Sequence, residues 1–277
     1  MRRKYIVEAL LREITQTLQA SQIPRAVREA QLLLMTYFDK DELWLLTNQK
    51  SEVELDDAFF DWVARRSRGE PFEYIVNRVS FYSQQFYIDE GALIPRPETE
   101  LLIDEVLKNI EDKEVAIRLA EVGVGSGIIS IMLALHLPNA KIIAIDISQK
   151  ALMVAQKNIE NFGLQNQIEL REGSLLEPLN EQIDYLVSNP PYIAEGEELG
   201  LNLSFEPQNA LFGGQIGDEI IQQLLDEVLR QKIKFFSCEM GYDQQDKIHS
   251  YLHNAEIQSL EFYQDYSSFD RGFTLKV

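Results

Sequence analysis

The first 70 residues have hydrophobic positions at the spacing of amphipathic helices. The first stripe consists of residues four apart among polar neighbours, namely Ile6, Leu10, Ile14 and Leu18. Pro24 suits the start of a second helix, because a missing N–H costs nothing in a first turn. Ser51–Glu54 has the pattern of a capping box and predicts that another helix begins there, with Gly69 near its end. These patterns predict a small helical domain.

The pattern then changes to β-prone and aromatic. Residues 79–88 hold two such runs around Ser83–Gln85, which predicts a β-hairpin between two domains. We therefore expect a helical domain over residues 1–75, a hairpin linker over 76–92 and a further domain over 93–277.

Beyond residue 93, short apolar runs alternate with helical stretches, which predicts an α/β domain with a parallel sheet. The predicted strands are 115–122, 141–147, 166–171, 183–188 and 233–240, and the predicted helices lie near 127–137, 149–162, 217–231 and 243–254. Runs 257–263 and 271–277 have no helix between them, so we expect them to form an antiparallel hairpin at the sheet edge.

Composition and charge limit the possible partners. A chain of 277 residues that is 45% hydrophobic has enough apolar residues for two cores, which excludes a disordered chain. Of the net charge of −19, residues 71–277 contribute −18, from 15 Lys and Arg against 33 Asp and Glu. Because such a surface repels phosphate backbones, we expect no direct binding of nucleic acid.

The cysteine content and the lengths of the apolar runs indicate where the protein is located. The single cysteine, Cys238, excludes an internal disulfide and a cysteine-based zinc site and fits a reducing compartment. No run of about 20 apolar residues is present. We expect a soluble, cytoplasmic monomer that does not bind membranes.

A glycine-rich segment follows the first predicted strand of the α/β domain. Gly123, Gly125 and Gly127 have the spacing G-x-G-x-G, which lets the backbone approach a ligand closely at the carboxyl end of the sheet. The dinucleotide fingerprint needs G-x-G-x-x-G, so the spacing favours an adenosine-binding loop over a pyrophosphate-binding one. Asp146 ends the next strand, nineteen residues after Gly127, where a carboxylate can accept both ribose hydroxyls.

A second motif, Asn-Pro-Pro-Tyr, follows the strand predicted over 183–188. Two consecutive prolines cannot donate to a sheet and hold the chain extended, which leaves the Asn189 side chain and the Pro190 carbonyl free to face a ligand. Their two oxygens can accept both N–H groups of a planar NH₂, while Tyr192 can stack on the planar group. The pattern therefore indicates chemistry at an amide or exocyclic nitrogen.

These motifs in this order resemble the class I S-adenosylmethionine-dependent methyltransferases. Further segments extend the resemblance to the bacterial release-factor glutamine methyltransferases (the HemK or PrmC family): Leu93–Glu100 with Pro-Arg-Pro-Glu-Thr-Glu, Arg66–Tyr74, Glu206–Gly217 and Glu239-Met240-Gly241. The match spans about residues 60–277, and the family's five-helix N-terminal domain and hairpin linker fit residues 1–92. The resemblance implies a seven-stranded Rossmann-like sheet with an antiparallel C-terminal hairpin, and an N-terminal domain that recognises the substrate.

The family implies methyl transfer from S-adenosylmethionine, with S-adenosylhomocysteine as product, to the side-chain amide nitrogen of the glutamine in the Gly-Gly-Gln motif of release factors. By motif matching, the cofactor residues would be Gly123, Val124, Gly125, Ser126, Gly127, Asp146, Ser174, Leu175 and Asn189. The catalytic residues would be Asn189, Pro190 and Tyr192, and Pro191, Arg96 and Glu98 would complete the substrate site. The chain departs from the family at Ser174, where an acidic residue is usual, and in the loop 265–271, which lacks the usual glycine.

Other functions remain open from the sequence. The chain has three histidines, and His249 and His253 share a helix face without a third ligand nearby, so we expect no metal site. Adenine N6 and guanine N2 are also exocyclic NH₂ groups, so a nucleic-acid N-methyltransferase is the main alternative, although the charge argues against it. A non-catalytic S-adenosylmethionine-binding protein is a third possibility, which the intact Asn189 and Asp146 disfavour.

Overall fold

The computed structural model describes residues 3–277, apart from the side chains of residues 201 and 202. The chain forms two compact units. One holds the chain up to Asn77 together with Gly200–Phe205, and the other holds Arg78–Leu199 and Glu206–Val277. The first break follows Asn77, two residues beyond the expected boundary. No helix within residues 3–277 is long and apolar enough to cross a membrane.

The described part of the N-terminal unit contains five α-helices and one small sheet, besides a 3₁₀ turn at Leu201–Phe205. The helices are α1 (Val7–Ala20), α2 (Ala26–Phe38), α3 (Glu42–Thr47), α4 (Asp57–Ser67) and α5 (Phe72–Val76). The strands β1 (Arg3–Ile6) and β2 (Glu52–Leu55) pair antiparallel. Of the apolar stripe predicted for the first helix, Leu10, Ile14 and Leu18 are buried in this unit's core, whereas Ile6 precedes the helix, in β1, and is exposed.

The capping box predicted at Ser51–Glu54 is wrong. Residues 52–55 form β2, and α4 starts only at Asp57, where the Asp56 side chain accepts a hydrogen bond from the Ala58 N–H. The alternation of Glu52, Val53, Glu54 and Leu55 has the two-residue period of a strand, and pairing with β1 satisfies its backbone. Tertiary pairing therefore overrides the local capping signal.

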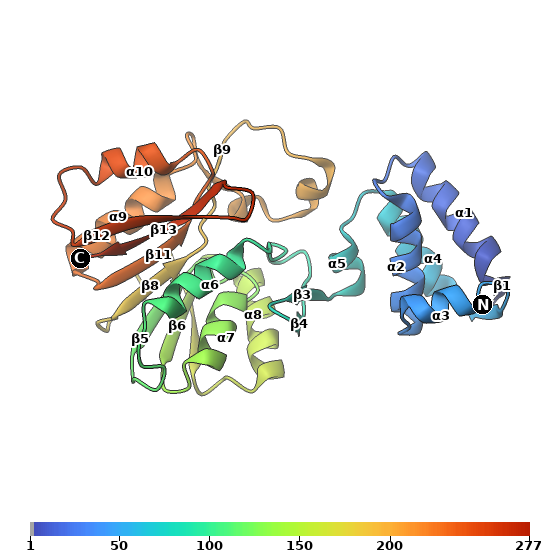
Figure 1. Ribbon diagram of the computed structural model, residues 1–277, viewed down its shortest axis with the longest axis horizontal. Helices are drawn as coiled ribbons and strands as arrows, with labels where there is room; N and C mark the ends of the chain where they lie inside the picture. The colour runs from blue at the N-terminus through green and yellow to red at the C-terminus, as the bar shows by residue number, and fades with distance from the viewer. Residues whose placement is uncertain (1–2) are drawn as a thin grey trace. The chain divides into compact units, whose positions relative to one another are not determined.

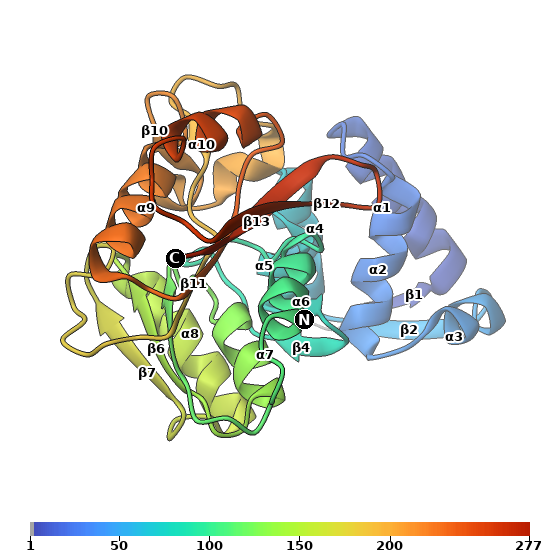
Figure 2. The same cartoon turned by 60° about the vertical axis from the view of Figure 1, so that its left-hand side comes forward.

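The larger unit is built on a seven-stranded sheet of order β12-β13-β11-β8-β5-β6-β7 (Figure 1). Its parallel strands are β5 (Arg118–Val122), β6 (Lys141–Asp146), β7 (Ile168–Glu172), β8 (Tyr185–Ser188) and β11 (Phe235–Glu239). The strands β12 (Ser259–Gln264) and β13 (Asp270–Lys276) run antiparallel at the edge (Figure 2). The predicted parallel sheet and its C-terminal hairpin are confirmed.

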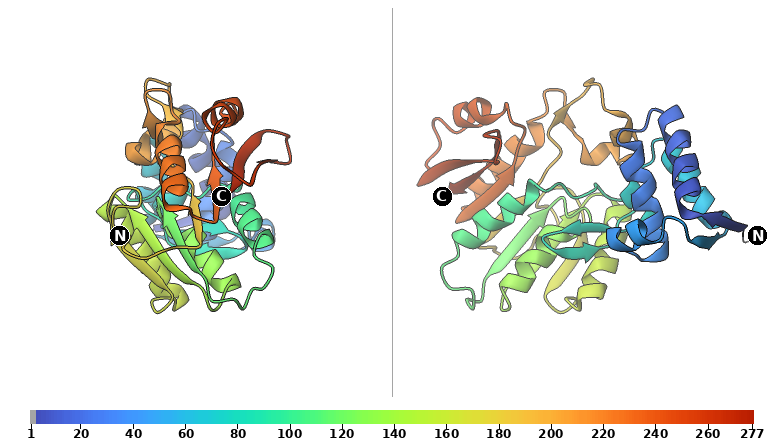
Figure 3. Two further views of the ribbon diagram at one scale, coloured as in Figure 1. Left: turned by 90° about the vertical axis from the view of Figure 1, so that its left-hand side faces the viewer. Right: turned by 45° about the vertical axis from the view of Figure 1, so that its right-hand side comes forward.

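Helices cover both faces of this sheet, as Figures 1 and 3 show. On one face lie α6 (Thr99–Lys108), α7 (Ile128–His136) and α8 (Gln149–Phe162), and on the other lie α9 (Glu219–Gln231) and α10 (Gln245–Tyr251). The apolar side of α9, including Leu224 and Val228, is fully buried against the sheet residues Leu186 and Phe236. The three-layer arrangement leaves the carboxyl ends of the parallel strands for a ligand site.

Several elements escaped the sequence analysis. Helix α6 was not predicted; its N-terminal flanking residue Glu98 makes no side-chain capping bond, so the usual start signal is missing. Short pieces after β8 were also missed, namely β9 (Ile193–Ala194), β10 (Phe212–Gly214) and the 3₁₀ turns η1 (Leu201–Phe205) and η2 (Gln208–Ala210). The predicted hairpin is formed by β3 (Val79–Phe81) and β4 (Gln84–Phe86), with the turn at Tyr82–Ser83.

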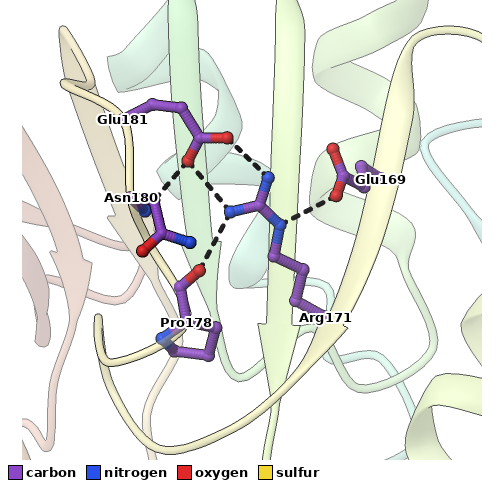
Figure 4. A network of polar contacts seen from close by, with 5 residues as sticks. All are labelled: Glu169, Arg171, Pro178, Asn180 and Glu181. Carbon is purple, nitrogen blue, oxygen red and sulfur yellow. Dashed lines mark hydrogen bonds and ion pairs between the residues drawn. The ribbon is translucent and has the colours of Figure 1, made fainter.

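An ion-pair network stabilises the other end of the sheet at β7 (Figure 4). The Arg171 guanidinium donates to both carboxylate oxygens of Glu181 at 2.9 and 2.7 Å, to Glu169 at 2.8 Å and to the Pro178 carbonyl at 2.9 Å. The hydrogen bonds from Arg171 lower the pKa of Glu181 to about 2. The network ties the loop before β8 to strand β7.

Candidate active site

A cavity of about 200 Å³ lies at the carboxyl ends of β5, β6 and β8. Its walls come from residues within segments that are far apart in the sequence: 91–99, 121–129, 145–151, 173–175, 189–191 and 207–210, together with Ile220. Both motifs singled out in the sequence contribute to these walls. The fold therefore brings the glycine loop and the Asn-Pro-Pro-Tyr segment to one site.

The glycine loop joins β5 to α7 with a left-handed backbone. Gly123, Gly125 and Gly127 have φ values of +78°, +53° and +83°, which side-chain-bearing residues rarely adopt. Gly123 and Gly125 line the cavity. Gly127 is not among the lining residues; instead, it packs against α8, where a Cβ would lie 3.3 Å from the Ala155 backbone. Its glycine is explained by helix packing.

Asp146 ends β6 beside this loop and is almost fully buried. One carboxylate oxygen accepts the Gly125 N–H at 2.9 Å and the other accepts the Ser148 N–H at 2.8 Å. Burial raises the pKa of Asp146, while these N–H donors oppose the rise. A carboxylate offers about four acceptor positions, so Asp146 can hold the loop and still accept a ligand hydroxyl.

A second buried carboxylate, Glu121, lines the cavity one strand away on β5. Ser130 donates to its Oε2 from both the backbone N–H, at 2.9 Å, and the side-chain hydroxyl. Its Oε1 is buried and has no hydrogen-bond partner in the part of the chain that the structure describes, and burial raises the pKa of Glu121 to about 8. Glu121 has no role among the residues predicted from the sequence, although a single acid within an apolar strand is a visible signal.

The Asn189 side chain is held by a chain of hydrogen bonds. Its Nδ2 donates to Thr99 Oγ1 at 3.2 Å, and Thr99 Oγ1 donates to Glu239 Oε2 at 2.8 Å. The other Glu239 oxygen accepts from the Tyr192 hydroxyl at 3.3 Å. Burial raises the pKa of Glu239 to about 7 and the pKa of Tyr192 well above its usual value. Neither Thr99 nor Glu239 was assigned a role from the sequence.

The loops around the Asn-Pro-Pro-Tyr segment are fixed by buried polar contacts. Arg96 Nη2 donates to Glu206 Oε1 at 2.6 Å, and Glu206 Oε2 accepts the Ile94 N–H at 3.0 Å. Gly213 packs so closely that a Cβ there would lie 2.3 Å from the Pro191 carbonyl oxygen. This contact requires glycine and sets the position of the Pro-Pro backbone.

The cavity contains most, but not all, of the residues expected in the site. Ten of them line it, namely Arg96, Gly123, Val124, Gly125, Ser126, Asp146, Ser174, Leu175, Asn189 and Pro191. Gly127, Pro190, Tyr192 and Glu98 lie outside its lining, and Tyr192 packs against the core beneath. Within residues 3–277, no three His, Cys, Asp or Glu side chains are grouped to hold a metal ion.

Two family models match the chain. Residues 96–207 match the methyltransferase small domain, and residues 9–76 match the PrmC N-terminal domain. The release factor glutamine methyltransferase of Koribacter versatilis is 38% identical over 245 residues, which cover 85% of this chain and 86% of the relative. The release factor glutamine methyltransferase of Clostridium acetobutylicum is 31% identical over 255 residues, covering 88% and 89% of the two chains.

Solved structures show the same fold at low sequence identity. The catalytic domain of human METTL16, solved in complex with a MAT2A 3′UTR hairpin, has a TM-score of 0.58 and 15% identity over 80% of this chain and 82% of that chain. The N-terminal domain of human METTL16 in complex with SAH has a TM-score of 0.51 and 17% identity, covering 77% and 78% of the two chains. These similarities establish the architecture of the sheet and its helices.

Proposed function

The chain belongs to the release factor glutamine methyltransferase family, and from this membership we propose that its cavity transfers a methyl group from S-adenosylmethionine to a release-factor glutamine. The acceptor is the side-chain amide nitrogen of the glutamine in the Gly-Gly-Gln motif. The observation that most supports this function is that Asn189 lines the same cavity as the glycine loop and Asp146.

The lining of the cavity fits a cationic adenosine ligand. S-adenosylmethionine has a sulfonium and an ammonium group, and two buried carboxylates, Asp146 and Glu121, line the cavity. Glu121 Oε1 has no hydrogen-bond partner within residues 3–277, so a ligand cation would relieve its desolvation. Gly123 and Gly125 leave room for the methionine part, Asp146 would accept the ribose hydroxyls, and Ser174 and Leu175 would contact the adenine side.

When bound, S-adenosylmethionine supplies an electrophilic methyl group. The protein's part is then to hold the acceptor amide in line and to stabilise the charge that develops on its nitrogen. The Asn189 side-chain oxygen and the Pro190 carbonyl oxygen are proposed to accept the two N–H groups. No donor among the described residues is bonded to either oxygen, which leaves both available.

Tyr192 would help to hold the Asn-Pro-Pro-Tyr segment in place, because its hydroxyl donates a hydrogen bond to Glu239. Arg96 and Pro191 line the cavity and are proposed to contact the substrate, whereas Glu98 would act through the electrostatics of the loop. We propose that the N-terminal unit, whose residues 9–76 match the PrmC N-terminal domain, recognises the release factor.

The direct test offers the protein isotope-labelled S-adenosylmethionine together with a purified release factor or, separately, with total RNA. We expect label in the release factor, located by mass spectrometry on the glutamine of Gly-Gly-Gln, and none when that glutamine is replaced by alanine. Labelled RNA with an unlabelled release factor would contradict the proposal.

A second experiment tests the cofactor site separately. Asp146→Ala should weaken the binding of S-adenosylmethionine and S-adenosylhomocysteine by about 1.5–3 kcal/mol, the range for hydrogen bonds to a charged group. Isothermal titration calorimetry measures this loss, and unchanged affinity would remove Asp146 from the cofactor site.

A further inference from the structure

The buried carboxylate of Glu239 is linked by hydrogen bonds to two side chains of the Asn-Pro-Pro-Tyr segment. It accepts directly from the Tyr192 hydroxyl and is connected to the Asn189 amide through Thr99. Glu239 is the last residue of β11, next to β8, which ends just before Asn189. The side chains of Glu239 and Thr99 belong to residues only 2% and 1% exposed. Glu239 Oε2 accepts from Thr99 at 2.8 Å, and Oε1 accepts from Tyr192 at 3.3 Å.

The donor and acceptor roles along the hydrogen bonds from Asn189 through Thr99 to Glu239 determine which way the Asn189 amide faces. A threonine hydroxyl has a single proton, and Thr99 donates that proton to the Glu239 carboxylate, which can only accept. Thr99 therefore has only lone pairs to offer Asn189, so the Asn189 NH₂ must face Thr99. The Asn189 oxygen is then left for the cavity. The reversed amide would put two acceptors face to face and present NH₂ to the substrate.

We propose that Glu239 is a positioning residue, which fixes the Asn189 amide orientation through Thr99 and holds the Tyr192 hydroxyl. This inference rests on the proposed function of Asn189 as acceptor for the substrate amide. A carboxylate is required at position 239, because the two oxygens of an ionised carboxylate can only accept hydrogen bonds. A carboxamide of the same shape can donate as well, so it no longer enforces one orientation.

The surroundings of Glu239 make its charge sensitive to pH. Burial raises its pKa to about 7, against the hydrogen bonds from Thr99 and Tyr192, which favour the ionised form. The other titratable or charged groups that interact with it are Glu98 before α6, Arg271 of β13, Tyr263 of β12 and the neighbouring Cys238. Protonation would let Glu239 donate to Thr99, which frees the threonine proton for Asn189 and permits the reversed amide.

The kinetic test compares Thr99→Val, Thr99→Ser and Glu239→Gln with the wild-type protein in methylation of a release factor. Thr99→Val removes the hydroxyl at nearly constant shape and should lower kcat about tenfold or more, with little change in S-adenosylhomocysteine affinity. Thr99→Ser keeps the hydroxyl and should restore kcat to within about twofold. Thr274→Val, the same change at a buried threonine of β13, is the matched control and should leave kcat unchanged.

The pH profile separates positioning from a purely structural role. In the wild-type protein kcat should fall as the pH drops below about 7, because Glu239 becomes protonated. In Glu239→Gln, kcat should be several-fold lower at pH 8 and should lack this step. If Glu239 and Thr99 only stabilise the fold, the variants would lower the melting temperature but keep the wild-type kcat and pH profile per folded molecule. That result would overturn the proposal.

A readout without substrate tests the hydrogen-bond chain through Thr99 and Glu239 separately from the proposed function. The side-chain NH₂ signals of Asn189 in ¹H–¹⁵N NMR spectra can be assigned by their loss in Asn189→Asp. They should shift with pH near 7 in the wild-type protein, remain constant in Glu239→Gln, and exchange faster with solvent in Thr99→Val. Asn189 signals that are insensitive to all three perturbations would refute the hydrogen-bond chain, even if the wild-type protein methylates release factors. Failure of wild-type methylation with sensitive signals would instead count against the proposed function alone.

Discussion

Replacing Asn189 by alanine should damage catalysis far more than folding. Among the described residues the Asn189 side chain makes one hydrogen bond, from Nδ2 to Thr99 Oγ1 at 3.2 Å. Its loss leaves Thr99 still bonded to Glu239, so no buried donor is left without a partner. We therefore expect the free energy of unfolding to fall by only about 0.5–1.5 kcal/mol, the net value of one hydrogen bond.

The transition state should lose more, because the Asn189 oxygen is proposed to accept an N–H whose nitrogen gains positive charge during methyl transfer. Removal of one preorganised contact of this kind costs about 3–4 kcal/mol, which lowers kcat by roughly 10² to 10³. Asn189→Asp keeps an acceptor of similar shape but removes the NH₂ that faces Thr99. It also places a second carboxylate beside the Thr99–Glu239 pair, so we expect it to lose most of the activity as well.

The assay is single-turnover methylation of a release factor, combined with calorimetric titration of S-adenosylhomocysteine and with urea unfolding. Asn139→Ala is the control, because Asn139 lies outside the cavity and its Nδ2 donates only to Glu114, to the backbone carbonyl at 2.8 Å and to the side chain at 3.2 Å, among the described residues. Methylation by Asn189→Ala within about threefold of the wild-type rate would refute the assigned role. Equal losses in methylation and cofactor affinity would mean that Asn189 acts mainly on the cofactor.

Three further predictions concern other parts of the larger unit. Gly213→Ala should lower methylation at least tenfold with little change in S-adenosylhomocysteine affinity, because its Cβ would displace the Pro191 carbonyl; normal methylation would contradict this. In the ligand-free protein, burial raises the pKa of Glu121 to about 8. Between about pH 4.5 and 8 the folded protein therefore keeps a proton on Glu121 that the unfolded chain releases. The free energy of unfolding should fall as the pH rises from about 4.5 to 8. Glu121→Gln should flatten this slope in urea unfolding at pH 5 to 8, and identical slopes would exclude the effect. Arg171→Met should lower the melting temperature by a few °C at neutral pH, on the order expected for losing a few hydrogen bonds. Because the pKa of Glu181 is lowered to about 2, the difference in melting temperature between Arg171→Met and the wild-type protein should shrink as the pH falls from about 4 towards 2. A difference in melting temperature that stays constant with pH would contradict the role of this ion pair.

The sequence alone was sufficient for most of the α/β architecture. The strands and helices of the larger unit follow from runs of apolar residues with the right length and period, and each predicted strand there lies within a few residues of an observed one. The capping pattern at Ser51–Glu54 failed because it is a weak local signal that competes with pairing to β1, whose residues lie 46 to 52 positions earlier in the chain. Helix α6 was missed for the opposite reason, because it lacks a local start signal.

The motifs also identified the two ends of the site, the glycine loop and the Asn-Pro-Pro-Tyr segment, since both depend on backbone properties that glycine and proline have in any context. The sequence did not reveal what orients Asn189, because its partner Thr99 is 90 residues away and the carboxylate behind it, Glu239, lies on another strand. The pairing of Arg96 with Glu206, 110 residues apart, was equally hidden.

The physical reason for this division is the range of the interactions. Helical and strand periods, glycine φ angles and the missing proline N–H act within a few residues, so the sequence itself determines them. A side-chain hydrogen bond requires two groups to lie about 3 Å apart, and burial requires a surrounding core. Only the tertiary structure decides which acids become buried, as Glu121 and Glu239 do, and therefore which of the 45 acidic residues have pKa values raised to about 7 or 8.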